Sequence, residues 1–407
     1  MSNKNTNYLG PLIIIGVLFF VFGFVTWVNA TLISFFKKAF QLDNAGSYLV
    51  TFAFFISYTL MAIPSSIVLK KTGFKNGMAL GLLIMALGTL IFIPAAQLAS
   101  YPLFLVGLFT IGIGLTLLQT ASNPYVTILG PKESAAQRIS FMGIANKLAG
   151  VFSQLIFAGI LLSGSAVALS AEEELKKVEV PYLVLTAVLV VLALVVRTSK
   201  GLPEVEAEEE EVTEGSVSAQ RTSIWSFPNL VLGIAAIFCY VGVEVIAADT
   251  VINYGISLGF AEEQAGKFGM YTLGGMMLGY LLGILLIPKV ISQNTYLKLS
   301  GVMGIAFSLL ALATEGIVSV YCIAFLGFAH ALVWPALWPL ALDGLGKYTK
   351  TASALLIMGI SGGAILPMVY GGIADKIGSE QQAYWLLIPL YGYILYYAFI
   401  GHKKKSW

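Results

Sequence analysis

The chain has 407 residues, of which 58% are hydrophobic and only 11% are Asp, Glu, Lys or Arg. Soluble proteins carry about 25% charged residues, so the composition excludes that class and predicts a polytopic protein surrounded by a lipid bilayer. The formal net charge of +2 is too small to indicate a nucleic-acid partner.

Twelve runs of mostly apolar residues are each long enough, at about 18 residues or more, to cross a bilayer as a helix. They lie near 10–36, 45–69, 75–96, 101–129, 138–164, 181–197, 228–256, 267–289, 295–313, 317–342, 351–373 and 381–400. The stretch between the sixth and seventh runs is acidic, then rich in Ser and Thr, which is typical of a mobile linker. We therefore predict an all-α membrane protein with twelve transmembrane helices: a six-helix bundle at 1–197, a cytoplasmic acidic linker at 198–226 and a second six-helix bundle at 227–407.

The distribution of Lys and Arg predicts the orientation. If both termini are cytoplasmic, 16 of the 23 basic residues fall on the inside, six fall on the outside, and Lys147 lies within a span. Basic residues are concentrated in cytoplasmic loops, so we predict that both termini are cytoplasmic.

The first span carries Trp27 and Asn29 in the segment FGFVTWVNATLI. A lone Asn at membrane depth often hydrogen-bonds a neighbouring helix. Beside Trp27 it can equally hold a hydroxylated ligand, so both residues are candidates for substrate binding.

The fourth and fifth spans contain polar residues that bilayer helices rarely tolerate: Gln119, Asn123, Asn146 and Lys147. Gln119 and Asn123 are four residues apart and share a helix face. Such amides either join helices or face a water-filled cavity. Lys147 favours the cavity, because a cation at mid-membrane costs ~3 kcal/mol or more. We take the three amides as candidate substrate ligands.

The two halves of the chain repeat each other. Asn123-Pro124 corresponds to Trp338-Pro339 at an offset of 215, and Met142-Gly143-Ile144 recurs as Met358-Gly359-Ile360 at an offset of 216. Leu129-Gly130 recurs as Leu345-Gly346, also at 216. Internal repeats are typical of transporters, in which the binding site lies between the repeats near mid-membrane.

The seventh span carries Glu244, Asp249 and Asn253 in YVGVEVIAADTVINYG. Intramembrane carboxylates often mark ion pathways, although an ion pair with Lys147 that only locks the halves together remains an alternative. Asp249 and Asn253 share a helix face and supply oxygen atoms, so they form a candidate Na⁺ site. Asn253 is also a candidate substrate ligand. The candidate cation-coupling residues are Asp249, Glu244 and Lys147. We predict that Asp249 is the coupling carboxylate and that Lys147 competes with the coupling ion for it.

The tenth span places His330, Trp334 and Trp338 at intervals of four, which predicts one stripe along a helix. Indole faces suit the apolar face of a sugar, and His can bind its hydroxyls. Aromatic stripes also occur as simple packing surfaces. Together with the amides of the fourth span, we interpret these residues as substrate ligands.

Soluble-enzyme motifs are absent from the sequence. It has no Walker loop, no metal-spaced Cys and His set, and only two histidines, His330 and His402. We therefore expect neither an ATP-driven pump nor an enzyme, and no cofactor beyond a coupling ion, Na⁺ or H⁺.

Several segments resemble the glucose/galactose branch of the fucose–proton symporter family, within the major facilitator superfamily. They are LLQTASNPYVTILGPKESAAQR, MGIANKLAG, ADTVINYG and ALVWPALWPLALDGLGKYTKTASALLIMGISGGAILP. The resemblance covers nearly the whole chain. It implies two six-helix bundles, alternating access, and cation-coupled uptake of a hexose such as glucose or galactose across a bacterial inner membrane, by a protein functional as a monomer.

The sequence departs from that family at two places. Where the fucose symporter has an Asp after the Asn of the first span, this chain has Ala30, and where it has a Glu this chain has Gln119. A coupling carboxylate must then come from the seventh span, and the resemblance slightly favours Na⁺ over H⁺. The alternatives are an N-acetylglucosamine or fucose/proton symporter, an uncoupled sugar facilitator, a membrane sugar sensor and, last, an intramembrane hydrolase.

Overall fold

The computed structural model describes residues 9–128, 135–162, 170–199, 223–286, 290–331, 333–345, 348–404 and 406–407. Within these ranges nearly every residue lies in a helix and no strand is present. This follows from the apolar runs, because a segment in lipid must satisfy its backbone hydrogen bonds internally, and a helix does so. The predicted all-α class is confirmed.

The elements of the first half are α1 (Leu9–Trp27), α2 (Asn29–Ala39), α3 (Asn44–Ser47), α4 (Leu49–Gln97), α5 (Tyr101–Ile128), α6 (Ala135–Phe157), η2 (Ala158–Leu162), α7 (Ala171–Leu175), η3 (Lys176–Val178) and α8 (Glu179–Thr198). Those of the second half are η5 (Ile224–Ser226), α9 (Pro228–Asp249), α10 (Val251–Ser257), α11 (Glu262–Ala265), α12 (Phe268–Leu286), α13 (Gln293–Ala313), α14 (Gly316–His330), α15 (Val333–Leu342), α16 (Thr349–Met358), η7 (Gly359–Ser361), α17 (Gly362–Ile377), α18 (Glu380–Ala383), η8 (Tyr384–Leu386), α19 (Leu387–Phe399) and η9 (Gly401–Lys403).

These elements build twelve spans. Among the described residues, ten helices are long and apolar enough to cross a bilayer, and α14 with α15 forms one more span, bent by 40°. The 49-residue helix α4 covers two spans, since the backbone at Gly73 breaks it with φ 75° and ψ 168°, a conformation that glycine adopts without steric cost. The prediction of twelve transmembrane helices is confirmed.

The boundaries of the two predicted bundles remain a prediction. The linker expected at 198–226 falls largely on 200–222, outside the described residues, as do Leu129-Gly130 and Gly346 of the internal repeat.

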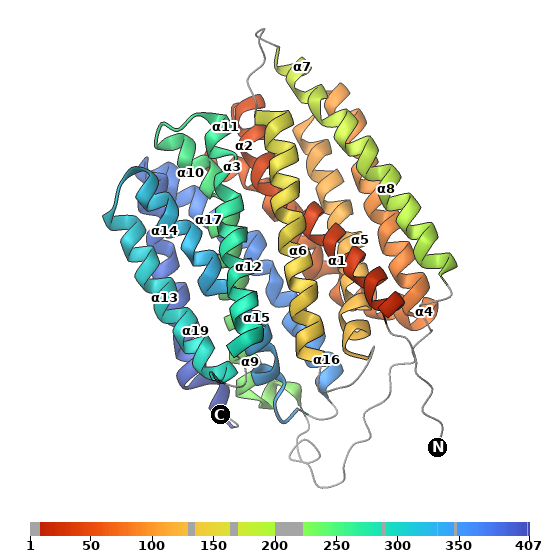
Figure 1. Ribbon diagram of the computed structural model, residues 1–407, viewed down its shortest axis with the longest axis vertical. Helices are drawn as coiled ribbons and strands as arrows, with labels where there is room; N and C mark the ends of the chain where they lie inside the picture. The colour runs from red at the N-terminus through yellow and green to blue at the C-terminus, as the bar shows by residue number, and fades with distance from the viewer. Residues whose placement is uncertain are drawn as a thin grey trace.

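The spans stand side by side, with the start of α1 and the end of α19 at the same end of the molecule (Figure 1). We call this end the base. The opposite end, where Figure 1 labels α3, α7 and α11, is the top. A shared end for the two termini fits an even number of spans, while placing the base in the cytoplasm remains a prediction.

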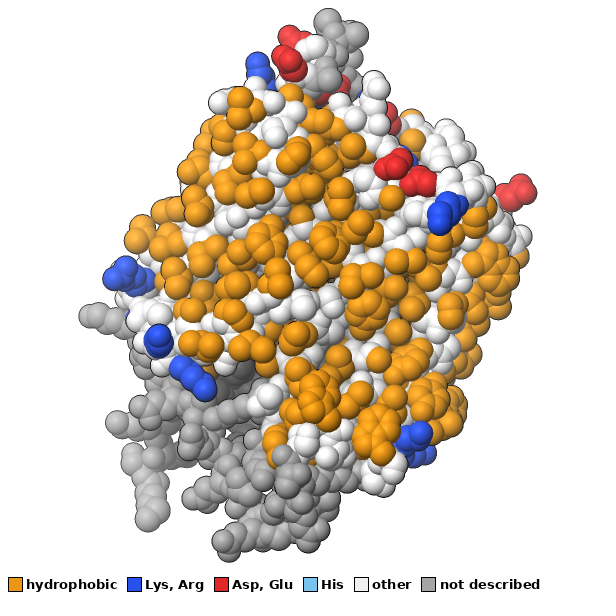
Figure 2. Space-filling view, turned by 180° about the vertical axis from the view of Figure 1, so that it is seen from behind, with side chains coloured by type: hydrophobic (Ala, Val, Ile, Leu, Met, Phe, Trp, Pro, Cys, Tyr) orange, Lys and Arg blue, Asp and Glu red, His pale blue; other side chains and the backbone are white. Residues whose placement is uncertain are grey.

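The outer surface suits a lipid environment. Figure 2 shows a face whose middle is covered by hydrophobic side chains, with the described charged side chains near its margins. On α8, for example, the side chains of Val184 and Val191 are 58% and 59% exposed. Exposed aliphatic side chains on this scale are typical of helices that face hydrocarbon.

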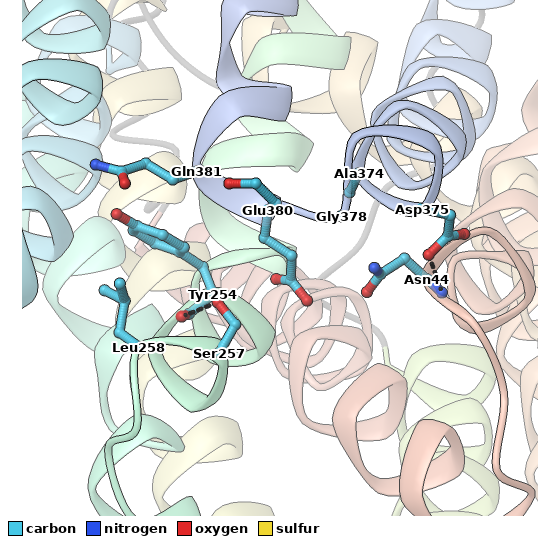
Figure 3. Close-up of a pocket in the computed structure, with 10 residues that line it drawn as sticks. Asn44, Tyr254, Ser257, Leu258, Ala374, Asp375, Gly378, Glu380 and Gln381 are labelled. Atoms are coloured by element: carbon cyan, nitrogen blue, oxygen red, sulfur yellow. Dashed lines mark hydrogen bonds between the residues drawn. The ribbon is translucent and has the colours of Figure 1, made fainter.

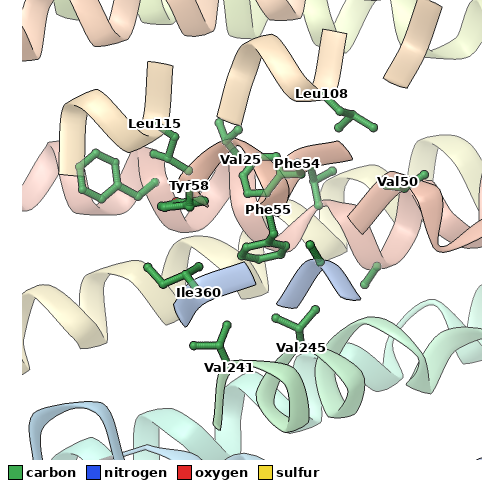
Figure 4. Close-up of a cluster of buried hydrophobic side chains, with 14 of the residues drawn as sticks. Val25, Val50, Phe54, Phe55, Tyr58, Leu108, Leu115, Val241, Val245 and Ile360 are labelled. Carbon is green, nitrogen blue, oxygen red and sulfur yellow. The ribbon is translucent and has the colours of Figure 1, made fainter. Parts of the chain in front are cut away.

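The spans of the two halves pack on each other in two main places. In one, α6 packs on α12, and in the other, α4 packs on α16, η7 and α17. The repeated Met-Gly-Ile segments, at residues 142–144 and 358–360, lie on the helices that make these two contacts. Figure 4 shows the apolar seam that results, with Phe55 of α4 pointing toward Val241 and Val245 of α9 and toward Ile360.

Polar bridges close the top between the halves. Lys37 of α2 pairs with Glu380 of α18 at 3.1 Å, and Lys38 pairs with Glu262 of α11 at 2.9 Å. The carboxylate of Asp375 accepts hydrogen bonds from the backbone N–H groups of Asn44 and Ala45 in α3, at 3.0 and 2.9 Å. The described residues of α5 and α15, which run toward the base in the two halves, make no comparable contact with each other.

A cavity of about 380 Å³ lies within this closure. Figure 3 shows the Glu380 carboxylate reaching between Asn44 and the Tyr254–Ser257 turn. Its lining comprises Asn44, Tyr254, Ser257, Leu258, Ala374, Asp375, Gly378, Ser379, Glu380 and Gln381. The top is therefore closed by hydrogen bonds and ion pairs that water can replace, rather than by a dry apolar plug.

Close packing of α1 on α6 gives a first prediction. A Cβ at Gly23 would lie 1.8 Å from the Asn146 carbonyl oxygen, so Gly23→Ala must push the helices apart. Overpacking of this kind costs ~1–3 kcal/mol. The matched control is Gly16→Ala on the same helix, where the nearest atom would be 3.9 Å away. We expect Gly23→Ala to lower the Tm of the purified protein and Gly16→Ala to leave it unchanged or raise it; equal Tm values would contradict this packing.

Candidate substrate and cation site

Three spans carry an irregularity beside candidate residues. The first has a turn at Val28, between Trp27 and Asn29, within a helix that runs on from Gly10 to Ala39, and the tenth bends between His330 and Val333. The seventh breaks at Thr250, directly after Asp249. There the Thr250 hydroxyl donates to the Ile246 carbonyl at 2.7 Å, a contact that bends helices. Broken spans expose backbone dipoles at mid-membrane and are typical of transporter binding sites.

A buried ion pair joins the halves at this depth. Lys147 Nζ of α6 lies 3.0 Å from Glu244 Oε1 of α9, and both side chains are buried. The structure therefore gives Lys147 a different partner from the one expected, since Asp249 was predicted to compete for it. Glu244 is the carboxylate that faces α6, whereas Asp249 lies about 140° further round the helix.

Trp27 and Asn146 fix the lysine in place. The Lys147 ammonium sits 4.0 Å from the centroid of the Trp27 ring, and the indole N–H donates to Asn146 Oδ1 at 3.0 Å. Gln154 of α6 donates to the Trp27 carbonyl at 3.2 Å. Trp27 is thus buried under a cation. In this state its indole supports the ion pair instead of presenting an open face to a sugar.

Asp249 and Asn253 each meet a side chain from the first half. Thr51 Oγ1 of α4 donates to Asp249 Oδ2 at 3.4 Å, and Ser34 Oγ of α2 donates to Asn253 Oδ1 at 2.6 Å. All four side chains are buried. Asp249 Oδ1 and Asn253 Nδ2 find no hydrogen-bond partner within the described part of the chain. Asp249 makes no ion pair there either.

Asn29 is fully buried, and neither its amide oxygen nor its amide nitrogen has a partner among the described atoms. Leaving such a group unsatisfied costs ~1–3 kcal/mol. Two roles were open for Asn29, a hydrogen bond to a neighbouring helix and the binding of a ligand. Among the described residues, no group on a neighbouring helix bonds its side chain. A ligand hydroxyl remains the hypothesis.

The stripe predicted on the tenth span is divided. His330 ends α14, is fully buried and contacts the Tyr391 hydroxyl through Nε2. Trp334 and Trp338 lie beyond the bend on α15 and stack with their ring centroids 5.0 Å apart. The prediction of one continuous stripe was wrong, because the bend between His330 and Val333 separates the histidine from the indoles. His330 packs inside the second half, while both indoles remain partly exposed.

The amide face of α5 is more open. Gln119 is partly buried and Asn123 is exposed. Among the described residues, no hydrogen bond or ring contact joins this face to Trp334 or Trp338. The amide face lies on α5 and the two indoles lie on α15, the helices that run toward the base in the two halves. Within the described part of the chain, these two helices do not pack on each other as α6 packs on α12. Their shared role in sugar binding stays a hypothesis.

Ser34, Thr51, Gln154 and Glu380 were missed from the sequence. Ser and Thr are common in membrane helices, where their hydroxyls bond the carbonyl four residues earlier. A side chain that instead reaches across to another span carries no local signal. Glu380 was detectable in principle, as a carboxylate directly before an apolar run.

This arrangement defines a class: two six-span halves that enclose buried charges and broken helices at mid-depth form a membrane transporter. The family model of the Major Facilitator Superfamily matches residues 15–367. A glucose/galactose transporter of Brucella abortus is 34% identical, with 99% of this chain and 97% of that protein covered. The L-fucose-proton symporter of Escherichia coli is 28% identical, covering 100% and 95%.

A crystal structure of the transporter FucP in the outward conformation aligns with a TM-score of 0.72 and 26% identity, over 96% of this chain and 98% of that one. The chain belongs to the Major Facilitator Superfamily, in the branch of the glucose/galactose transporters and fucose–proton symporters. Its relatives are transporters, which supports the expectation that it is not an enzyme.

The buried ion pair gives a second prediction. Removing one partner of such a pair leaves a buried charge unpaired and typically costs about 3–5 kcal/mol. We expect Lys147→Met to lower the Tm strongly and Lys147→Met/Glu244→Leu to recover most of the loss. The control is Lys38→Met, which removes a more exposed pair worth about 0–1 kcal/mol. A double variant as unstable as Lys147→Met would mean that the charges do not compensate each other.

Proposed function

We propose that the protein takes up a hexose such as glucose or galactose together with a cation, by alternating access across a bacterial inner membrane. The observation that carries the proposal is the buried, unpaired Asp249 at a helix break, in a chain 34% identical to a glucose/galactose transporter. A buried carboxylate without a cationic partner is costly, and a bound cation removes that cost.

We favour Na⁺ over H⁺ as the coupling ion. The family resemblance associates proton coupling with an Asp and a Glu at the places of Ala30 and Gln119, which cannot titrate. Asp249 with Asn253 offers oxygen ligands instead, which suit a hard cation. Proton coupling is the second candidate, because an L-fucose-proton symporter is 28% identical.

Sugar recognition is assigned to the base-side surfaces. Gln119 and Asn123 can hydrogen-bond hydroxyls, and the stacked Trp334 and Trp338 offer an apolar face beside Tyr240. Asn29 and Asn146 lie deeper and are proposed to bind the sugar once the halves rearrange. With the base in the cytoplasm, the top-closed molecule is the inward-facing state of a monomeric carrier.

The third prediction tests coupling. Proteoliposomes should accumulate labelled glucose or galactose under an inward Na⁺ gradient and less under a proton gradient. Asp249→Asn mimics the neutralised carboxylate, so it should abolish accumulation yet keep sugar exchange, whereas the exposed Glu263→Gln should behave as the parent. Accumulation by Asp249→Asn at the parent level would exclude its coupling role. Downhill flux without accumulation in the parent would indicate a facilitator, and sugar binding without flux a sensor.

The fourth prediction tests the indoles. Trp338→Ala or Trp334→Ala should weaken sugar binding about ten-fold or more, since burying an aromatic side chain contributes roughly 1.5 kcal/mol or more. The fluorescence of that Trp should also respond to sugar. Trp385→Ala, an exposed Trp at the top, is the matched control. Unchanged affinity in both variants, together with a sugar-induced fluorescence change equal to that of the parent, would assign the indoles to packing.

A further inference from the structure

Two pairs of buried side-chain oxygens lie between the halves, on the top side of the Lys147–Glu244 ion pair. One pair joins Thr51 to Asp249 and the other joins Ser34 to Asn253. Asp249 and Asn253 lie one turn apart across the break in the seventh span, and each contacts a hydroxyl from the first half. Asp249 and Asn253 are four residues apart along this span, which is about one helical turn. The two hydroxyl contacts therefore lie about one turn apart, and we treat them as one polar cluster.

The contacts in this cluster are incomplete as hydrogen bonds. The Thr51–Asp249 distance of 3.4 Å exceeds the usual O–H···O range of about 2.5–3.0 Å. Asp249 Oδ1 is buried with no partner among the described atoms. Lys147, the nearby cation, is already paired with Glu244. The cluster thus holds a carboxyl group and several other oxygens without a balancing cation.

The local backbone also favours a cation. The 22-residue helix α9 ends at Asp249, and the C-terminal end of a helix carries partial negative charge. In transporters with discontinuous helices, such C-terminal ends coordinate Na⁺ or H⁺. A proton would need the Asp249 carboxylate alone, whereas the gathered hydroxyl and amide oxygens match the coordination of a metal cation.

We propose that Ser34 and Thr51 of the first half complete a sodium site with Asp249 and Asn253 of the second half. The ion is then held by both halves when the top is closed. Sodium arriving from the top side meets Asp249 and Asn253 first, and closure adds the two hydroxyls. This inference deepens the proposed function and rests on it for the role of the ion, while the site itself can be tested without sugar.

The test measures Na⁺ binding to purified, sugar-free protein. Tm is recorded while Na⁺ replaces K⁺ at constant ionic strength, since a ligand of the folded state raises Tm. The parent should respond to Na⁺. Thr51→Val and Ser34→Ala should each weaken the apparent Na⁺ affinity by about ten-fold, as expected for one contact to a charged ligand. Thr51→Ser keeps the hydroxyl and should titrate like the parent.

Buried controls separate this effect from general damage. Thr89→Val on the same helix α4 and Ser57→Ala remove equally buried hydroxyls that bond only within the first half. Both should keep the parent's Na⁺ response. A parent without a Na⁺ response, or Thr51→Val and Ser34→Ala variants that titrate like the parent, would overturn the site.

The two proposals fail in different ways. A Na⁺ response that depends on Thr51, together with no uptake of any hexose, would keep the sodium site and refute the sugar function. Uptake driven only by a proton gradient, with no Na⁺ response, would keep sugar symport and refute the sodium site.

Discussion

A lysine at mid-membrane constrains the whole structure. Lys147 cannot remain charged in hydrocarbon, and its partner Glu244 belongs to the other half of the chain. Removing each ion from water costs several kcal/mol, so the halves must either close over the pair or admit water to both charges. Trp27 and Asn146 hold the closed arrangement. This constraint ties the packing of the halves to the hydration of the space between them.

Polar contacts of decreasing exposure run from the top of the molecule toward this pair. The partly exposed bridges of Lys37 and Lys38 lie at the surface, the cluster around Asp249 lies deeper, and the Lys147–Glu244 pair is buried. An apolar seam around Phe55 runs beside them (Figure 4). Each polar contact exchanges protein partners for water at modest net cost, which suits halves that must separate and close repeatedly.

The sequence was sufficient for the architecture because bilayer thickness turns apolar runs into spans directly. It also singled out Lys147, Glu244, Asp249 and Asn253 as candidates, since charged and amide groups are rare within membrane spans. It could not choose the partner of Lys147, because helix rotation is set by packing between halves.

Two other features were not read from the sequence. Pro335 removes the backbone hydrogen bond to the carbonyl of residue 331 and so signals the bend after His330, but helix spacing alone placed the histidine with Trp334 and Trp338. The roles of Ser34 and Thr51 depend on which residues face them across the halves, and this is not encoded locally.

The central claim is that the halves open and close at the top in response to the transported ion. Spin labels at Leu98→Cys and Gln264→Cys, exposed top positions in opposite halves, report this directly when Cys239 and Cys322 are replaced by Ala. Double electron–electron resonance should show a short distance in Na⁺ and an added longer population when K⁺ replaces Na⁺. A single distance, unchanged by Na⁺ and by sugar, would contradict the account.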